Sequence, residues 1–274
     1  MTTDHATAPA PASIRMDLAT ILMSRRLITF ASVATALLLW EFFGRQVNPL
    51  FGSYPSAIAA KMVELTLNGR LPGAFFQSLQ PFVVGFGIAA ILGIPIGMLL
   101  GRFRFMEAAF GIYVTAGNAM PLVAITPLFM LWFGLGFNVK VAIIATLSFF
   151  PICMSTWSGV KSIPKSLIEV GESFVGSRRA ILQKIVLPAS VPYIMAGIRL
   201  AVGKGIIAMI VAEFFTALSG LGGIILTAAN NFETAEMFAP IIVLLAFAIL
   251  LNAFVQWLEK VIAPWHLQVT GQGD

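Results

Sequence analysis

Few residues in this chain have side chains that could catalyse a reaction or hold a metal ion. It has one cysteine, Cys153, and two histidines, His5 and His266, which lie near opposite ends. A single cysteine excludes an intrachain disulfide and a cysteine-cluster metal site, and two distant histidines argue against a histidine-based metal centre. The sequence also lacks the HExxH and GxSxG patterns of zinc proteases and serine hydrolases. These observations argue against an enzyme.

The stretch GIRLAVGKG, residues 197–205, superficially resembles a phosphate-binding Walker A loop. It has five residues rather than four between the glycines, and Gly205 stands where a Ser or Thr would hold magnesium. It also lies within an apolar run with no preceding strand. The chain is therefore expected to bind neither a nucleotide nor any other cofactor.

Three charged residues, Glu41, Lys204 and Glu213, lie within or at the ends of long apolar runs. An ionised group in such a run is costly and needs a partner or water. Lys204 and Glu213 are nine residues apart, or about 900° of helical rotation, so they point to opposite faces. They therefore cannot pair within one helix.

The composition explains why charged groups are rare. Of the 274 residues, 58% are hydrophobic and 11% are charged, whereas an ordinary globular domain has roughly 25% charged residues. So few polar residues cannot cover a soluble domain of this size, which predicts an all-α integral membrane protein. The net charge of +5 comes from bases scattered beside apolar runs, a pattern typical of membrane topology and not of nucleic-acid binding.

Six apolar runs are long enough to cross a bilayer, which takes about 20 residues per helix. The first follows Arg25 and Arg26 and has no small-residue cleavage site after it, so we interpret it as a retained membrane helix and not as a signal peptide. Pro95, Pro121 and Pro127 fall inside later spans, where kinks are expected. The five later spans cover residues 78–101, 106–133, 139–160, 191–217 and 237–262.

The basic residues predict the orientation of these spans. If the N-terminus is cytoplasmic, six spans place both termini in the cytoplasm, and the inner segments carry more bases than the outer ones, as the positive-inside rule requires. The inner bases are Arg15, Arg25, Arg26, Arg102, Arg104, Lys161, Lys165, Arg178, Arg179, Lys184 and Lys260, and the outer ones are Arg45, Lys61, Arg70 and Lys140. Residues 1–24 and 266–274 are then cytoplasmic tails, the first of them disordered, and residues 25–265 form the transmembrane domain.

The cytoplasmic loop between the fourth and fifth spans, residues 161–190, is unusually charged for this chain. Gly176 followed by Ser177, a favourable N-cap, predicts two short helices with a bend between them. From its periodicity alone the loop could lie on the bilayer surface or hold a protein partner. Its apolar residues recur at helical spacing with polar residues opposite; they are Leu167, Val170, Phe174, Ile181 and Ile185.

This loop resembles the EAA motif of binding-protein-dependent ABC importer permeases, in which Glu-Ala-Ala is followed by Gly and, further on, by Ile-x-Leu-Pro. Glu169 matches the acid, and Ile185, Leu187 and Pro188 fall at the family's spacing. Val170 and Gly171 replace the two alanines, and Val175 replaces the glycine, with Gly176 one position late. The segments MPLVAITPLFMLWFGLG, FFPICMSTWSGV and GIRLAVGKGIIAMIVAEFF with SGLGG extend the resemblance over residues 54–265, to the nitrate/sulfonate/taurine/bicarbonate branch.

The resemblance implies a set of partners and a location. Such a permease forms a homodimer in the bacterial inner membrane, pairs with two separate ATPase subunits that bind the ATP, and receives its solute from an external binding protein. Because this chain has no nucleotide site of its own, the energy must come from a partner on the cytoplasmic face, and the 162–188 loop is the one sizeable feature there.

The resemblance also suggests roles for the loop residues, with alternatives that remain open. Glu169 is expected to orient the loop or to contact the ATPase, or else to be a solvated surface acid. Val170, Phe174 and Val175 are expected to fill an apolar groove on the ATPase, or else to pack against the permease's own helix ends. The remaining residues of the coupling motif are Gly171, Gly176, Ile185, Leu187 and Pro188.

Three residues are candidates for the substrate pathway. Lys204 could attract nitrate, sulfonate or bicarbonate, or its side chain could snorkel to the inner membrane surface. Asn118 could line a cavity or form a hydrogen bond between helices. Glu213 is expected to be a structural hydrogen-bond acceptor near the outer end of its span or a contact for the external binding protein.

Two other classes of function compete with an ATP-driven importer. A channel or a secondary transporter would work without an ATPase, and nothing in the sequence excludes either one. A membrane-embedded enzyme is disfavoured because the catalytic motifs are missing. The sequence does not name the solute.

Overall fold

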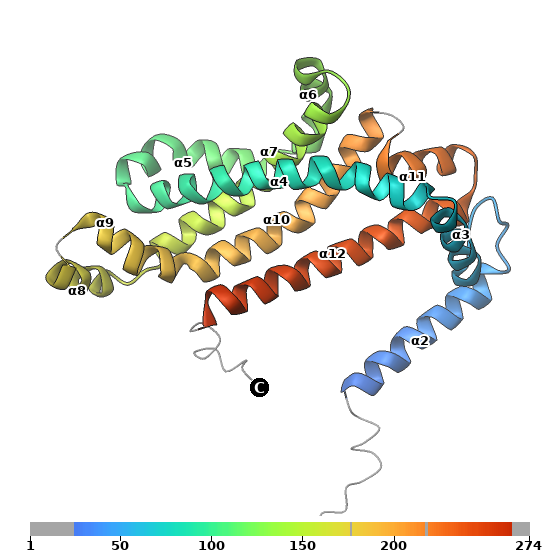
Figure 1. The fold of residues 1–274 in the computed structure, drawn as a ribbon, viewed down its shortest axis with the longest axis horizontal. Helices are drawn as coiled ribbons and strands as arrows, with labels where there is room; N and C mark the ends of the chain where they lie inside the picture. Colours follow the sequence, from blue (N-terminus) through green and yellow to red (C-terminus); the bar gives the residue numbers. More distant parts are fainter. Residues whose placement is uncertain (1–24, 176, 217–218, 265–274) are drawn as a thin grey trace, which may run out of the picture.

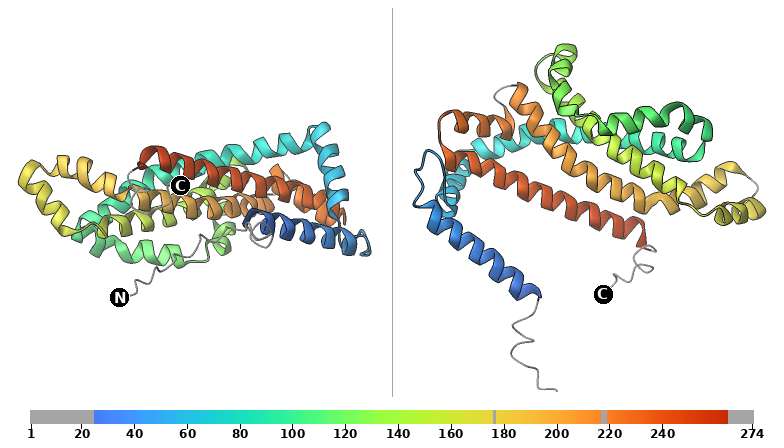
Figure 2. Two further views of the ribbon diagram at one scale, coloured as in Figure 1. Left: turned by 90° about the horizontal axis from the view of Figure 1, so that it is seen from below. Right: turned by 180° about the vertical axis from the view of Figure 1, so that it is seen from behind.

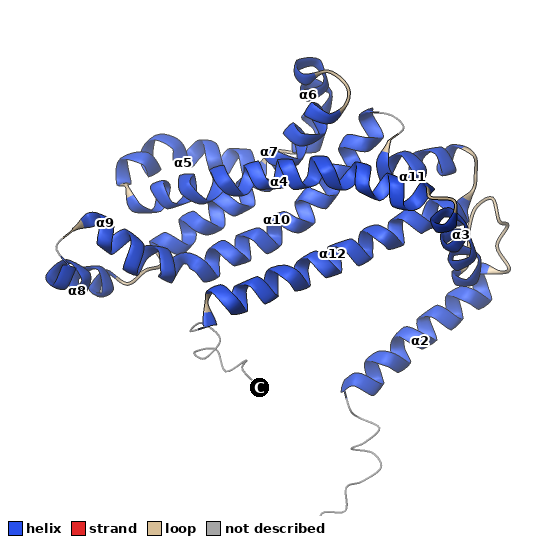
Figure 3. Cartoon of the chain, viewed as in Figure 1, coloured by secondary structure: helices blue, strands red, loops and turns tan. Residues whose placement is uncertain are grey.

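The computed structural model describes residues 25–175, 177–216 and 219–264. Within these ranges the chain consists of helices joined by turns, without strands (Figure 3). The predicted tails, residues 1–24 and 266–274, and the predicted bend at Gly176 lie outside the described residues. The prediction of an all-α membrane protein is confirmed.

Five described helices are long and apolar enough to cross a membrane, or six spans exist if a bent pair of helices counts as one. The long helices are α2 (Arg25–Gly44), α4 (Arg70–Arg102), α7 (Phe137–Lys161), α10 (Leu187–Thr216) and α12 (Thr234–Ile262). The bent pair consists of α5 (Arg104–Ala119), the 3-10 turn η1 (Leu122–Ile125) and α6 (Thr126–Phe133). The shorter elements are α3 (Pro55–Leu67), α8 (Lys165–Val175), α9 (Arg178–Ile181), the π-helical turn η2 (Leu182–Val186) and α11 (Gly220–Asn230).

The bundle is organised around a close contact between α4 and α7 (Figures 1 and 2). Small residues recur every four positions on α4 along this contact, at Gly93, Gly97 and Gly101. A Cβ atom at Gly97 would lie 2.5 Å from the carbonyl oxygen of Cys153, and one at Gly101 would lie 2.5 Å from Cβ of Val160. Larger side chains would push the helices apart, so this spacing of glycines sets their distance.

The main apolar core lies where α4, α7, α10, α11 and α12 meet. Its fully buried members include Ile144, Val202 and Leu221. α2 is different, because it diverges from the bundle and nearly all its side chains are exposed (Figure 1). Its described attachment is at its C-terminal end, where Trp40 Nε1 donates a hydrogen bond of 2.9 Å to the carbonyl oxygen of Ser53.

The third span is broken, which differs from the prediction of one kinked helix over residues 106–133. The axes of α5 and of the helix that follows the break differ by 87°. Met120 is extended, with ψ at 138°, because a residue before proline is disfavoured in the helical region and Pro121 has no N–H group to continue the helix. Pro127 makes no kink, since it lies in the first turn of α6, and Pro95 lies inside the continuous helix α4.

The bundle has two distinct ends (Figure 1). We call the end that carries α8 and α9 the α8 end, and the end that carries α3 and α11 the α3 end. α7 ends and α10 begins on one side of the bundle. The first residues of α2 and the last residues of α12 lie toward this same side (Figures 1 and 2). A chain that crosses the membrane an even number of times would have this arrangement.

Candidate functional site

One side of the segment from α8 to η2, residues 165–186 (the α8–η2 segment), is packed against the chain itself. Ile181 and Val186 are buried together with Ile163, and Ile168 and Ile185 pack against them. Gly171 faces inward, because a Cβ atom there would collide with Cδ1 of Ile185. Gly171 therefore lets α8 lie close against η2.

The other side of α8 is exposed and apolar. The exposed fractions are 43% for Leu167, 54% for Val170 and 86% for Phe174, so the remainder of the described chain does not cover them. Glu169 is also exposed, and within the described residues its carboxylate forms no ion pair. The predicted apolar stripe is thus divided between a buried half and an exposed half.

The remaining residues of the predicted motif continue the segment. Ser177 caps α9, because the backbone N–H of Ala180 donates a hydrogen bond of 3.2 Å to Ser177 Oγ, as expected for a second short helix. Leu187 is 39% exposed at the start of α10, and Pro188 beside it is half-buried. Val175 ends α8, and Gly176 lies outside the described residues.

Lys204 and Asn118 are brought together from different helices. Lys204 Nζ, on α10, donates a hydrogen bond of 3.1 Å to Asn118 Oδ1, on α5. Lys204 precedes the end of α10 at Thr216 by 12 residues (216 − 204), or about 18 Å along the helix axis. It follows the start at Leu187 by 17 residues (204 − 187), or about 26 Å. The ammonium group is therefore held far from both ends of α10.

A cavity of about 230 Å³ adjoins this hydrogen bond. Its lining includes Lys204 and Asn118, the broken stretch at Met120 and Pro121, and apolar side chains such as Phe150. Non-helical backbone at membrane depth occurs where it lines a cavity or is covered by protein, because its polar groups need partners. The structure thus brings together the proline break and the lysine, which are far apart in the sequence.

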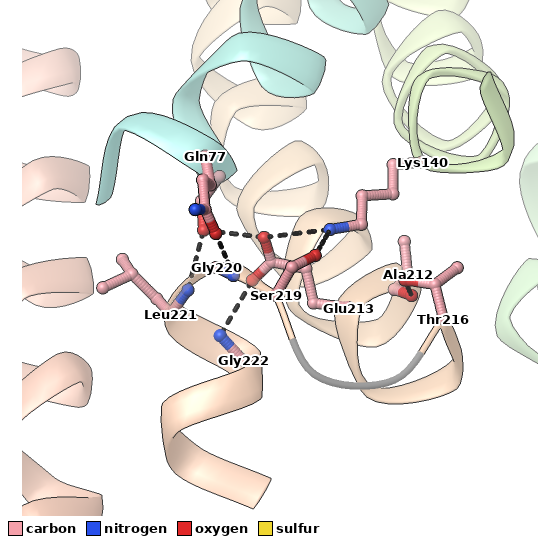
Figure 4. A network of polar contacts seen from close by, with 10 residues as sticks. Gln77, Lys140, Ala212, Glu213, Thr216, Ser219, Gly220, Leu221 and Gly222 are labelled. Atoms are coloured by element: carbon pink, nitrogen blue, oxygen red, sulfur yellow. Dashed lines mark hydrogen bonds and ion pairs between the residues drawn. The ribbon is translucent and has the colours of Figure 1, made fainter. Parts of the chain in front are cut away.

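Glu213, near the end of α10, is the centre of a buried polar network at the α3 end (Figure 4). The Ser78 hydroxyl donates to Glu213 Oε1 over 2.7 Å, and the backbone N–H of Gly222 donates to Oε2 over 2.8 Å. Lys140 Nζ lies 3.7 Å from Oε1 and donates a hydrogen bond of 2.8 Å to Ser219 Oγ. Glu213 is completely buried, so its carboxylate is unavailable to an external protein.

The glycines of the SGLGG stretch are needed by this network. Gly220 has φ at +82°, and a Cβ atom there would collide with the Glu213 carboxylate. A Cβ atom at Gly222 would lie 2.7 Å from Cβ of Glu213. The first amides of α11 can therefore approach the carboxylate, which the positive end of a helix dipole stabilises.

Sequence reasoning missed several of these partners. Lys140 was expected to be an outer base that sets topology, but its side chain is 6% exposed and is paired with Glu213. A second polar cluster at the α3 end joins Arg70 NH2 to Glu236 Oε1 over 2.9 Å, with Lys61 Nζ 3.7 Å from Glu236 Oε2. A hydrogen bond to Glu64 raises the pKa of Lys61. For the buried pair of Lys140 and Glu213, the signal that the sequence offered was a lysine at the edge of an apolar run.

Comparison with known protein families gives a match over residues 93–266 to the binding-protein-dependent transport system inner membrane component family. The match covers more than half of the chain and includes the α8–η2 segment, Lys204 and Glu213. The chain belongs to this family.

Individual relatives of this permease agree with the family match. It is 31% identical over 240 residues to the "Putative aliphatic sulfonates transport permease protein SsuC" of Bacillus subtilis, covering 87% of each chain. It is 30% identical to the formylaminopyrimidine transport permease protein ThiX of Halalkalibacterium halodurans, covering 84% of this chain and 92% of that one. It is 28% identical to the taurine transport system permease protein TauC of Escherichia coli, covering 88% and 90%.

These matches confirm the resemblance that the loop motif indicated. The permease is a multi-pass protein of the inner membrane and a transport subunit, not an enzyme. Its family implies a partnership with an ATPase and a solute-binding protein, so a channel or secondary transporter that works alone is not favoured. The stretch of residues 197–205 that resembled a nucleotide loop is part of helix α10.

Proposed function

We propose that two copies of this permease form a homodimer that imports a small anion of the nitrate, sulfonate, taurine or bicarbonate type. Two ATPase subunits bind the ATP and dock on the α8–η2 segments, and the permease itself holds no cofactor. An external solute-binding protein delivers the anion. The N-terminus, the C-terminus and the α8 end face the cytoplasm.

The single observation that carries the coupling role is the exposed apolar surface of α8. Phe174 is 86% exposed on a helix whose opposite side is fixed by Gly171 and Ile185. A large exposed aromatic side chain is the kind of group that anchors a helix in a partner's groove. Glu169, also exposed on α8, would add charged hydrogen bonds, and Leu187 and Pro188 would border the contact.

The distribution of charge supports the proposed orientation. Bases cluster on the segments at the α8 end, where Arg102 ends α4, Arg104 begins α5 and Lys161 ends α7. Cytoplasmic segments carry such an excess of bases. Lys140 is one of the predicted outer bases, but it is paired with Glu213. Its charge is therefore balanced, and it is not evidence against this orientation.

The pathway is proposed to pass Lys204. Lys204 is an exposed residue in the single chain, although it lies well inside α10. A charge at this depth cannot face hydrocarbon, so it must face water or another protein chain. This requirement supports both an aqueous pathway beside Lys204 and Asn118 and a second copy that encloses that pathway. Glu213 lies at the α3 end of the same helix, where it fixes the structure.

The coupling proposal is tested by Phe174→Asp. The unpaired charge would be buried in the apolar contact, at a cost of several kcal/mol, so the variant should insert normally but lose its ATPase during co-purification and lose ATP-driven uptake. Phe51→Asp is the matched control, because Phe51 is 76% exposed and precedes α3 at the opposite end. Retention of both ATPase and uptake by Phe174→Asp would show that α8 is not the docking surface.

A further inference from the structure

A separate cavity of about 670 Å³ lies at the α8 end, between the last turns of α4 and the α8–η2 segment. Its apolar lining comes mainly from α4 and includes Pro95, Met98 and Leu99. Its charged lining consists of Arg102, at the end of α4, Glu172 on α8 and Arg179 on α9. The cavity thus combines an apolar wall with two cations and one anion.

These three charged groups have no partner within the described part of the chain. Arg102 is half-buried, yet neither it nor Arg179 forms an ion pair, and Glu172 pairs with neither arginine although it lines the same cavity. A guanidinium group presents several N–H donors in a fixed fork that suits the oxygens of a phosphate. A ligand that carries both a negatively and a positively charged group would therefore match the charged lining of the cavity.

The position of the cavity along α4 indicates its surroundings. α4 is a candidate membrane span that ends at Arg102, and Pro95 precedes Arg102 by seven residues (102 − 95), or about 10 Å of helix. The apolar lining therefore lies at the depth of acyl chains when the arginines lie at the depth of headgroups. Basic residues at this boundary attract lipid phosphates.

We propose that this cavity binds one phospholipid of the phosphatidylethanolamine type. The phosphate lies between the guanidinium groups of Arg102 and Arg179, the ethanolamine ammonium donates hydrogen bonds to the Glu172 carboxylate, and an acyl chain lies along Met98 and Leu99. A choline headgroup has no N–H to donate to Glu172, and a glycerol headgroup has no positive charge. Ethanolamine satisfies all three charged groups.

The bound lipid would connect α4 with the α8–η2 segment, which also meet where Met98 packs against the cluster that contains Ile181 and Val186. Arg102 belongs to the bundle, whereas Glu172 and Arg179 belong to the α8–η2 segment. The lipid thus fixes the position of α8 relative to α4. Lipid binding does not depend on the proposed ATPase contact, because the exposed surface of Phe174 is not part of the cavity lining.

The test measures lipid retention by native mass spectrometry on the purified full-length permease, alone and with its ATPase, after exchange into equal amounts of phosphatidylethanolamine, phosphatidylglycerol and phosphatidylcholine. We expect selective retention of phosphatidylethanolamine. Arg102→Gln combined with Arg179→Gln should lower it by about tenfold or more, since charged hydrogen bonds are lost. Glu172→Gln should remove the preference for ethanolamine over glycerol. Leu99→Trp should lower retention by filling the cavity without changing any charge.

Matched controls separate this site from general membrane affinity. Arg104→Gln removes an exposed arginine just beyond α4, and Leu92→Trp enlarges an exposed leucine two turns before Leu99; neither residue lines the cavity. Both should retain the lipid normally. Unchanged retention in the double arginine variant, or equal retention of phosphatidylcholine, would overturn the proposal. Displacement of the lipid by millimolar inorganic phosphate would also overturn it, because the site would then belong to a small free anion.

Discussion

At the scale of single residues, the contact between Lys204 and Asn118 changes how the lysine is interpreted. A snorkelling lysine extends its side chain along the helix toward the membrane surface. Here the ammonium group is instead bound to an amide oxygen on another helix, 3.1 Å away, beside a cavity and a break in the backbone. This placement favours the pathway role that the sequence left open. Among the described residues, the hydrogen bond of Asn118 is made by its amide oxygen, which leaves the amide nitrogen free to donate to an anion.

Lys204→Met tests this role directly. Removing a charge that binds an anion should reduce ATP-driven uptake in proteoliposomes by about 10- to 100-fold, the effect of one or two charged hydrogen bonds. Lys204→Arg should keep part of the activity, because the charge remains while the headgroup becomes larger and planar. Leu200→Met, on an exposed leucine one turn earlier in α10, is the control. Normal uptake by Lys204→Met, with an intact complex, would remove this lysine from the pathway.

Single residues also show where sequence reasoning stops. The Ser177 cap was predictable, because its partner Ala180 is three residues away and the local pattern is specific. The pairing of Lys140 with Glu213 was not, because it depends on which of several helices pack together. A positive-inside count treats every base at a span end as equivalent, and so it could not detect that Lys140 is buried.

At the scale of elements, the positions of the long membrane helices were predictable and their internal shape was not. Long apolar runs identify α4, α7, α10 and α12 because length and hydropathy are properties of one segment. The break at Pro121 is different. Prolines occur in several spans, yet Pro95 lies within the continuous helix α4, whereas Pro121 lies at the break where the helix axis turns by 87°. Whether a helix bends or breaks depends on what can satisfy its freed carbonyl groups.

The network around Glu213 ties four elements together, and a double-mutant cycle measures this connection. Lys140→Met leaves the buried Glu213 carboxylate without its cation, and breaking one partner of a buried pair typically costs about 3–5 kcal/mol. Adding Glu213→Gln should recover part of that loss, because the uncompensated charge is removed while an amide can still bond Ser78 and Gly222.

The measurement for this cycle is the thermal unfolding of the purified permease in detergent. The expected order of midpoints is wild type, then the double variant, then Lys140→Met. Lys61→Met, which removes a half-buried lysine from the other polar cluster at the α3 end, controls for loss of any lysine. If Lys140→Met unfolds at the same temperature as wild type, Lys140 does not support the Glu213 carboxylate, which is then held by the Ser78 and Gly222 hydrogen bonds alone.

At the scale of the whole molecule, the two ends of the bundle are built for different tasks. At the α3 end, a buried ion pair links α7 to α10 and a partly exposed one links α4 to α12. The α8 end carries an exposed apolar surface on α8 and a cavity lined by two arginines that form no ion pair with the described residues. This difference between the ends suits a permease whose ATPase docks at one end, where the contact surface must be accessible.

The orientation that this difference implies is tested by cysteine labelling in intact cells. Cysteine at Leu67 or at Asn231, both exposed at the α3 end, should react with a membrane-impermeant maleimide added from outside. Cysteine at Phe103 or at Ser173, both exposed at the α8 end, should react only after permeabilisation. Gly220 is unsuitable as an outer position, because any side chain there would collide with Glu213. The native Cys153 is buried and should give little background. Outside labelling at Ser173 would place α8 in the periplasm, where no ATPase could reach Phe174, and the coupling proposal would fail together with the orientation.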